Sequence, residues 1–391
     1  MRRVFCLAAA ALLAFLAGAA EQAQATTVGP AQAGWGQVGE LSFATGDDLS
    51  LALDRNGTPY IAFRNSADGS KASVMRFDGT SWVQVGGGAA STGAASDISL
   101  ALDGTGIPYV AFSNAVDGGK LRVVKLNNSD WVKVGGDTDI SSRDTLDISL
   151  AVDNSGTPFV AYSESGAEPW DYAQATMKTL NGTDWGAFRG AGFSVDAASS
   201  VSLALNSDGI PHVAYIYQDV DERKKIGAIK YGDTSWVPVG TAGFAEVADI
   251  SASLAVDSNS IPYVAFSDAA DGGKANVLRF NGITWTQVGA AAASEGAATN
   301  ISLALSTSGV PYVAYSDAAN SGKVGIKKLN GTAWEQVGTT VFQSDADNIN
   351  LVLSGSGTPY VLFSDMESKI SVMKYSNNIA MPWLDLLLHK K

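Results

Sequence analysis

The chain is poor in the residues that make covalent cross-links and in the residue most used for acid–base chemistry. Among 391 residues it has one cysteine, Cys6, and two histidines, His212 and His389. A single cysteine excludes an intramolecular disulfide framework, so stability must come from a large buried core. His212 stands where the other repeats described below have an aromatic residue, and we interpret it as a packing variant rather than a catalytic acid or base.

Long apolar runs are also scarce. The one long run, Val4–Ala20, follows Arg2 and Arg3 and precedes a small-residue sequence at 23–25, a pattern that predicts a signal peptide over residues 1–25. We therefore expect a secreted or periplasmic protein that is free of disulfides after cleavage. No later run approaches the roughly 20 apolar residues that span a bilayer, so membrane insertion is not expected.

Positive charge is in deficit, since 26 basic residues face 39 acidic ones and the net charge is −13. This balance argues against nucleic acid and anionic membrane surfaces as partners.

What the chain has in abundance is a repeat of about 50 residues. A tryptophan and a proline recur once in each repeat. The tryptophans are Trp35, Trp82, Trp131, Trp185, Trp236, Trp285 and Trp334, and the prolines are Pro59, Pro108, Pro158, Pro211, Pro262, Pro311 and Pro359. Each unit contains four short apolar segments separated by Asp, Asn and Gly turns, which predicts four antiparallel strands. Helical periodicity is absent.

Four-stranded units repeated seven times predict an all-β fold, a seven-bladed β-propeller of antiparallel blades. We expect one propeller domain over residues 26–379 and an irregular tail over 380–391. The segment 35–39 is a fourth strand with no first three before it, while the last unit has a degenerate fourth strand. We therefore expect the N-terminal strand to close the last blade, with Trp383 as the competing candidate.

Polar residues recur at one face of the predicted ring, where each first strand begins and each second strand ends. We call the first set the inner ring: Asp48, Asp97, Asp147, Ser200, Ser251, Asn300 and Asn348. The second set is the outer ring: Asn65, Asn114, Glu164, Tyr217, Asp268, Asp317 and Asp365. One interpretation is that these carboxylates cap strand ends and pair with the hairpin lysines Lys71, Lys120, Lys274, Lys323 and Lys369. The alternative is a focused negative potential that suits a cation or a hydroxyl-rich ligand.

Two neighbouring units depart from the repeat in the loop after the second strand. The third unit has an insertion that carries Glu164, Trp170, Asp171 and Tyr172, and the fourth has a charged loop that includes Asp219. Aromatic rings beside carboxylates are typical of a sugar-binding surface. A hydrophobic plug formed by Trp170 is the alternative.

The turns at 257–262 and 281–285 resemble those of secreted bacterial propeller proteins with kelch-like, Asp-box-like or lectin-type repeats. This resemblance implies architecture and not an activity, because propellers carry many functions. A sialidase-like protein would have converging arginines, and the turn or third-strand positions of Arg55, Arg76, Arg122 and Arg279 suggest no such cluster.

These patterns favour a non-catalytic binding module that recognises carbohydrate or protein through its acidic face. The candidate ligand-binding residues are Trp170, Asp171, Tyr172, Glu164, Asp219, Asp48, Asp97 and Asp147. The alternative is a carboxylate-based hydrolase or lyase of the glycoside class, for which no catalytic residue is assigned. We expect a monomer without a cofactor or metal, with calcium as a weaker alternative.

Overall fold

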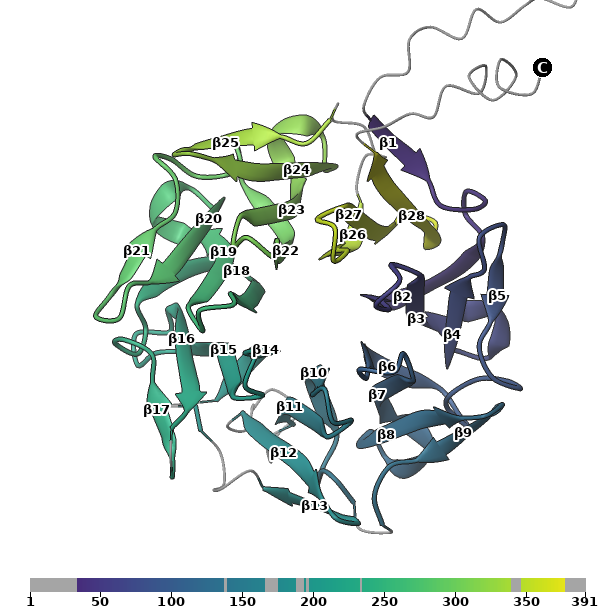
Figure 1. Cartoon of the computed structure of the whole chain (residues 1–391). Helices are drawn as coiled ribbons and strands as arrows, with labels where there is room; N and C mark the ends of the chain where they lie inside the picture. Colours follow the sequence, from purple (N-terminus) through teal and green to yellow (C-terminus); the bar gives the residue numbers. More distant parts are fainter. Residues whose placement is uncertain are drawn as a thin grey trace, which may run out of the picture. The chain divides into compact units, whose positions relative to one another are not determined.

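The computed structural model describes residues 34–136, 139–165, 175–187, 193–194, 197–232, 234–338 and 346–376. Residues Gly34–Ser376 form one compact unit. Its described part contains 28 strands and four short 3-10 helices, η1 to η4. The strands form four-stranded antiparallel groups arranged as seven blades around a central opening (Figure 1). This arrangement confirms the predicted all-β propeller. The predicted boundaries at residues 25 and 379 lie outside the described residues.

The blades are numbered here in chain order. Blade 1 contains β2 (Ala44–Leu53), β3 (Pro59–Asn65), η1 (Ser66–Asp68), β4 (Lys71–Phe77) and β5 (Trp82–Gln84). Blade 2 contains β6 (Ala95–Leu102), β7 (Pro108–Asn114), η2 (Ala115–Asp117), β8 (Lys120–Asn127) and β9 (Asp130–Lys133). Blade 3 contains β10 (Thr145–Val152), β11 (Pro158–Glu164), β12 (Thr176–Asn181) and β13 (Asp184–Ala187). Blade 4 contains β14 (Ala198–Leu205), β15 (Pro211–Gln218), β16 (Lys224–Tyr231) and β17 (Trp236–Pro238).

Blade 5 contains β18 (Ala245–Val256), β19 (Pro262–Asp268), η3 (Ala269–Asp271), β20 (Lys274–Phe280) and β21 (Trp285–Gln287). Blade 6 contains β22 (Ala298–Leu305), β23 (Pro311–Asp317), η4 (Ala318–Asn320), β24 (Lys323–Asn330) and β25 (Ala333–Gln336). Blade 7 contains β26 (Asp347–Leu353), β27 (Pro359–Ser364), β28 (Lys369–Ser376) and, from the start of the chain, β1 (Gly34–Gln37). The first strand of each blade lies nearest the central opening (Figure 1).

Each blade begins with a hairpin whose turn is built by one side chain. In blade 1 the Oδ1 atom of Asp54 accepts hydrogen bonds from the backbone N–H of Asn56 (2.9 Å) and Thr58 (2.8 Å). Gly57 completes this turn with a φ of 80°, a conformation that costs glycine little. Pro59 then begins the second strand, where its missing N–H is not needed.

Large side chains of one blade pack against small side chains of the next. Val110 and Phe112 of blade 2, for example, share a buried cluster with Ala62 and Ala72 of blade 1. The first strands are also linked from blade to blade by serine hydroxyls that accept a hydrogen bond from a leucine N–H of the following blade. These serines are Ser50, Ser99, Ser149, Ser202, Ser253 and Ser302, and all six bonds are 3.0 Å long. The small polar positions of the first strand are therefore part of the contact between blades.

In most blades the recurring tryptophan ties the outer edge of the blade to the blade before it. The indole N–H of Trp285 donates to the carbonyl of Val239 at 2.8 Å, and that of Trp82 donates to Val38 at 2.8 Å. The glycine after this valine has a positive φ in blade after blade, and a Cβ at Gly39 would lie 2.9 Å from the Trp82 ring. The recurring Trp and the Val-Gly pair are therefore the two halves of one contact between blades.

Trp131 offers a matched test of this contact, because its buried indole N–H has no hydrogen-bond partner. We expect Trp285→Phe to lower the free energy of unfolding by about 1 kcal/mol more than Trp131→Phe, since only the first change removes a hydrogen bond. Chemical denaturation of the two variants measures the difference. Equal losses would mean that the indole bond contributes nothing.

The ring closes through the N-terminal strand. β1 pairs antiparallel with β28, with Gly34 opposite Ser376 and Gln37 opposite Met373. The Trp35 indole donates to the carbonyl of Val337 in blade 6 at 2.7 Å, the same kind of bond that Trp82 and Trp285 make. This confirms the expected closure by Trp35. Trp383 lies outside the described residues.

At two junctions, neighbouring blades also share a β-ladder. β28 of blade 7 pairs with β2 of blade 1, and β16 of blade 4 pairs with β18 of blade 5. Both junctions place a phenylalanine on the blade's tryptophan: Phe43 stacks on Trp82 at 4.6 Å and Phe244 on Trp285 at 4.4 Å between ring centroids. The described part of the chain contains no helix long and apolar enough to cross a membrane.

Candidate functional site

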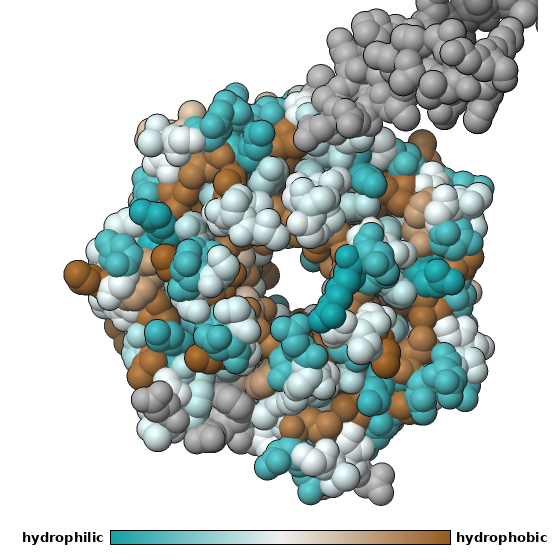
Figure 2. Space-filling model, in the orientation of Figure 1, coloured by the Kyte–Doolittle hydropathy of each residue, from teal (hydrophilic) through white to brown (hydrophobic). Residues whose placement is uncertain are grey.

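The inner ring lies on the face where the first strands begin and the second strands end. Asp48, near the start of β2, lies 3.4 Å from Arg64 at the end of β3. Asp147, near the start of β10, accepts a 3.4 Å hydrogen bond from Ser163 at the end of β11. We call this the top face. Figure 2 shows one face of the ring, with a mainly hydrophilic rim around the central opening and hydrophobic residues between the blades.

The backbone conformation explains in part why aspartate and asparagine recur in the inner ring, and the sequence pattern does not reveal it. Five of its seven members sit at a β-bulge with a positive φ of 50° to 54°. They are Asp48, Asp97, Asp147, Asn300 and Asn348. Aspartate and asparagine tolerate this left-handed conformation better than most residues. The recurrence of these two residue types is therefore explained in part by the bulge, while the choice of a charged residue in blades 1 to 3 is not.

Charge at the inner ring is concentrated in these three blades. The backbone N–H of Asp147 donates to Oδ1 of Asp97 at 3.3 Å, which holds the two residues of neighbouring blades together. Burial, reinforced by the charge of Asp97, raises the pKa of Asp147 to about 7. Burial and the same neighbour raise the pKa of Asp48 to about 6, although Arg64 opposes the change. Burial also raises the pKa of Asp97. Two of the three carboxyls therefore titrate close to neutral pH.

Arg64 is the functional candidate that the sequence analysis missed. It forms an ion pair with Asp47 and lies 3.4 Å from Asp48, so one guanidinium serves two carboxylates at the channel mouth. Five other blades have serine at this position, Ser113, Ser163, Ser267, Ser316 and Ser364, and blade 4 has Ile216. The sequence signal for this residue is an arginine at a position where most repeats have serine.

Uncharged groups complete the ring in blades 5 to 7. The Ser251 hydroxyl donates to Asp249 at 2.8 Å and accepts the N–H of Asn300 at 3.1 Å. The side-chain amide of Asn348 donates to the Ser364 hydroxyl at 3.4 Å. The channel mouth is thus acidic on one side and carries hydroxyl and amide groups on the other.

Glu164 and Asp219, two predicted ligand-binding residues, bind nearby loop residues instead of joining the inner ring. Both Glu164 carboxylate oxygens accept hydrogen bonds from Ser142, one from its N–H (2.9 Å) and one from its hydroxyl (2.7 Å). Asp219 accepts the N–H groups of Asp221 and Arg223 and pairs with the Arg223 guanidinium at 3.3 Å. Trp170, Asp171 and Tyr172 lie outside the described residues, so their role stays a prediction.

Several outer-ring residues cap the helix that follows them, as the capping interpretation predicted. Asn65, Asp268 and Asp317 each accept a hydrogen bond from the backbone N–H two residues later. The expectation that the hairpin lysines pair with the outer-ring residues was wrong for Lys71 and Lys274. Lys71 pairs with Asp68 at 3.1 Å and Lys274 with Asp271 at 3.2 Å, because the hairpin tip lies closer to the lysine than the strand end does.

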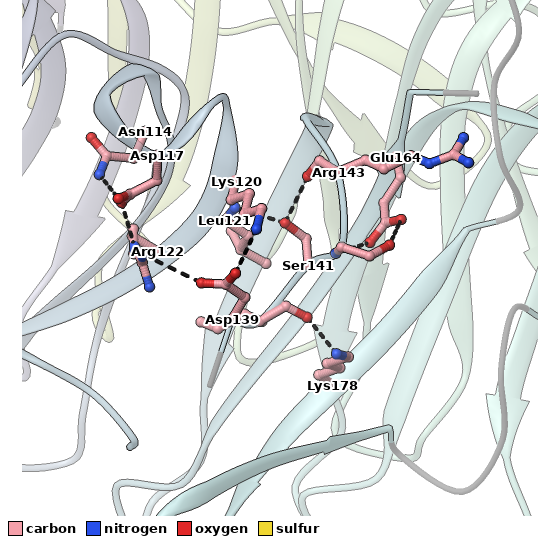
Figure 3. A network of polar contacts seen from close by, with 12 residues as sticks. Asn114, Asp117, Lys120, Leu121, Arg122, Asp139, Ser141, Arg143, Glu164 and Lys178 are labelled. Carbon is pink, nitrogen blue, oxygen red and sulfur yellow. Dashed lines mark hydrogen bonds and ion pairs between the residues drawn. The ribbon is translucent and has the colours of Figure 1, made fainter. Parts of the chain in front are cut away.

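Arg122 belongs to a cluster of ion pairs that contains none of the other three arginines considered from the sequence (Figure 3). Its guanidinium lies 2.6 Å from Asp117 and 3.5 Å from Asp139, and Asp139 also pairs with Lys120 at 2.6 Å. The cluster contains as many carboxylates as cations. We therefore interpret it as a contact that fixes the loop before β10. Among the described residues, no group of three or more His, Cys, Asp or Glu is arranged to hold a metal ion.

No protein-family model and no curated protein matches the sequence. Solved structures do share the fold. An ulvan lyase bound to -[GlcA(1-4)Rha3S]- aligns over 92% of this chain and 98% of its own, with a TM-score of 0.56 and 11% identity. A puromycin-hydrolyzing peptidase of Mycobacterium tuberculosis aligns over 90% of this chain and 58% of its own, with a TM-score of 0.52 and 12% identity. A lectin of Aleuria aurantia in complex with Fucalpha1-6GlcNAc aligns over 73% of this chain and 98% of its own, with a TM-score of 0.47 and 13% identity. The chain is thus similar in fold to a lyase and to a peptidase, two proteins of differing activity.

Proposed function

We propose that the protein is an exported, non-catalytic carbohydrate-binding module whose ligand sits at the channel mouth. The observation that carries the proposal is the inner ring with Arg64. It places carboxyl, guanidinium, amide and hydroxyl groups around one opening. Sugar hydroxyls both donate and accept hydrogen bonds, so they suit a rim that offers both kinds of group.

The raised pKa values strengthen this argument. A carboxyl with a pKa of about 6 or 7 exists in both forms near neutral pH, so Asp48 and Asp147 can each accept or donate a hydrogen bond to a hydroxyl. Arg64 adds a fixed donor on the same rim. That the ulvan lyase of the same fold is bound to a saccharide is consistent with this proposal.

Arg64→Ser provides the sharpest test, because serine is the residue that five other blades carry at this position. The change keeps the repeat pattern and removes one donor, so we expect a thermal midpoint close to that of the parent. Affinity for the glycan found on an array should fall at least about tenfold, the effect of losing a charge-assisted hydrogen bond. Titration calorimetry measures the loss.

Asp103→Asn is the matched control, since Asp103 builds a turn on the opposite face. It should leave glycan binding unchanged. Trp170→Ala with Tyr172→Ala tests the predicted aromatic surface separately. Binding that survives Arg64→Ser but not the aromatic double change would move the site away from the channel mouth. If the parent binds a protein and no glycan, the proposed ligand is wrong and a protein takes its place.

The raised pKa of Asp48 and Asp147 favours one second candidate, a carboxylate-based glycoside hydrolase or lyase. A panel of chromogenic glycosides, incubated with the parent protein and with Asp147→Asn, separates the two functions. Turnover that is lost in the variant would establish the enzyme and overturn the non-catalytic proposal.

A further inference from the structure

The face opposite the inner ring carries a ring of cations in an otherwise acidic protein. Near the end of its third strand each blade has a basic residue, except blade 3, which has Thr179. These residues are Arg76, Lys125, Lys230, Arg279, Lys328 and Lys374. Each lies opposite the residue after the recurring proline, which is tyrosine in five of these blades and His212 in blade 4. The basic residue and its cross-strand aromatic partner are therefore a second repeated pair.

Lys230 and Arg279 make fewer side-chain contacts than some other members of this set. Lys125 lies 5.6 Å from the centre of the Tyr109 ring and Lys374 lies 5.3 Å from that of Tyr360, within the range of a cation–π contact. Lys230 and Arg279 are exposed, and neither has an ion pair or a cation–π contact within the described part of the chain. Their charges are uncompensated by any direct contact.

These two side chains, from neighbouring blades, line one cavity of about 450 Å³. Ser260, Asn281 and Phe280 contribute to the same wall, and no carboxylate is among the described residues that line it. A cavity of about 390 Å³ on the same face, between blades 3 and 4, is lined instead by Asp153 and Asp208 without a lysine or arginine. Of these two cavities, the one between blades 4 and 5 carries the positive charge, and we call it the basic cavity.

Ser260 is a further departure from the repeat at this place. The other six blades have glycine here: Gly57, Gly106, Gly156, Gly209, Gly309 and Gly357. Ser260 keeps the positive φ of that turn at 62°, a conformation that costs a non-glycine residue about 1 kcal/mol. Its hydroxyl oxygen accepts a 2.9 Å hydrogen bond from the side-chain amide of Asn206, which leaves the hydroxyl proton free to be donated elsewhere.

We propose that the basic cavity binds an oxyanion, the sulfate or carboxylate group of an acidic ligand. The planar guanidinium of Arg279 matches the two oxygens of such a group, Lys230 adds a second charge from the facing blade, and the Ser260 hydroxyl adds a donor. This site lies on the opposite face from the inner ring and is independent of the function proposed there.

The test uses dextran sulfate and polygalacturonate as probes, with neutral dextran as the blank, and titration calorimetry at low and physiological salt. We expect the parent to bind at least one acidic polymer, and the polymer that binds identifies the preferred oxyanion. Lys230→Glu with Arg279→Glu should lower the affinity at least about tenfold. Ser260→Gly should weaken binding less, because it removes one neutral donor and leaves both positive charges in place.

Arg76→Glu with Lys328→Glu is the matched control, because it makes the same charge change at equivalent positions in other blades. It should retain binding to within about twofold, and Arg64→Ser should retain it fully. An equal loss in this control would show that the whole face, rather than the basic cavity, attracts the polymer. If the first double variant unfolds, Lys230→Ala with Arg279→Ala takes its place. Absence of binding to either polymer by the parent would overturn the proposal.

Discussion

Deleting β1, Gly34–Gln37, is expected to cause the largest loss of stability of any change considered for this protein. The deletion exposes the edge of β28, removes the 2.7 Å indole bond from Trp35 to Val337 and takes the Trp35 ring from its edge-on contact with Tyr375 at 5.4 Å. Removal of a packed tryptophan alone costs roughly 3 to 5 kcal/mol, and an open β-edge promotes pairing with other chains. Thermal melting and light scattering should therefore show a lowered midpoint and aggregation.

Deletion of residues 380–391 serves as the comparison. It removes Trp383 and leaves every described contact of β1 in place, so we expect a smaller change in melting temperature. The reverse order, with the C-terminal deletion more damaging than the loss of β1, would transfer the closing role to Trp383 and contradict the pairing of β1 with β28.

Replacing Asp48, Asp97 and Asp147 together by asparagine is expected to stabilise the protein at neutral pH. Asparagine suits the left-handed backbone at these positions, as Asn300 and Asn348 do in blades 6 and 7. It keeps an acceptor for the N–H of Asp147, and Arg64 keeps its ion pair with Asp47. The change therefore removes unfavourable charge and few favourable contacts.

The effect has a definite dependence on pH. Asp147 has a pKa of about 7 in the fold against an ordinary value of 3.8, so between these values the folded state holds a proton that the unfolded chain has released. The parent protein therefore loses stability as pH rises from about 4 to about 7, and the loss is complete above that range. The asparagine variant lacks this loss. Its advantage should grow from near zero at pH 4 to roughly 4 kcal/mol at pH 8 from Asp147 alone, by the conversion of its raised pKa into free energy.

Asp103→Asn is a control in which the change in stability depends on pH in the opposite direction. Burial tends to raise the pKa of Asp103, but hydrogen bonds from Thr105 and Ile107 outweigh it and lower the pKa. The stability that this carboxylate contributes is present above the unfolded pKa and is lost as pH falls, so the control should be weaker than the parent mainly at neutral pH. A triple variant whose advantage does not change between pH 4 and pH 8 would contradict the raised pKa values.

The fold followed from the sequence because its signals are repeated seven times. The tryptophans and the turn residues recur in all seven units and the Val-Gly pair in six, and Trp35 fits this pattern better than Trp383 does. The contact itself did not follow, since nothing in a one-dimensional pattern shows that the indole of one blade bonds the valine carbonyl of the blade before it.

The site was less predictable because its contacts depend on how strands and loops pair in space. The pattern placed Asp48, Asp97 and Asp147 on one face, but the bulge that explains their residue type depends on pairing register. The role of Arg64 did not follow from the sequence, because the ion pairs of an arginine at the end of a second strand depend on which carboxylates the bulge of the first strand brings beside it. Glu164 and Asp219 were assigned to the ligand because the partners that occupy them, Ser142 and Arg223, cannot be told from loop composition.

The antiparallel pairing of β1 with β28 has a mechanical consequence. Gly34 and Ser376 face each other at one end of this pair, so tension that draws the two ends of the ring apart loads that first pair alone. The strands then separate like a zipper, one residue pair after another, instead of sliding past each other with all their hydrogen bonds loaded at once. A pulling force would therefore open the ring at this junction before it unravels any other blade, and release of the force would let four residues close it again.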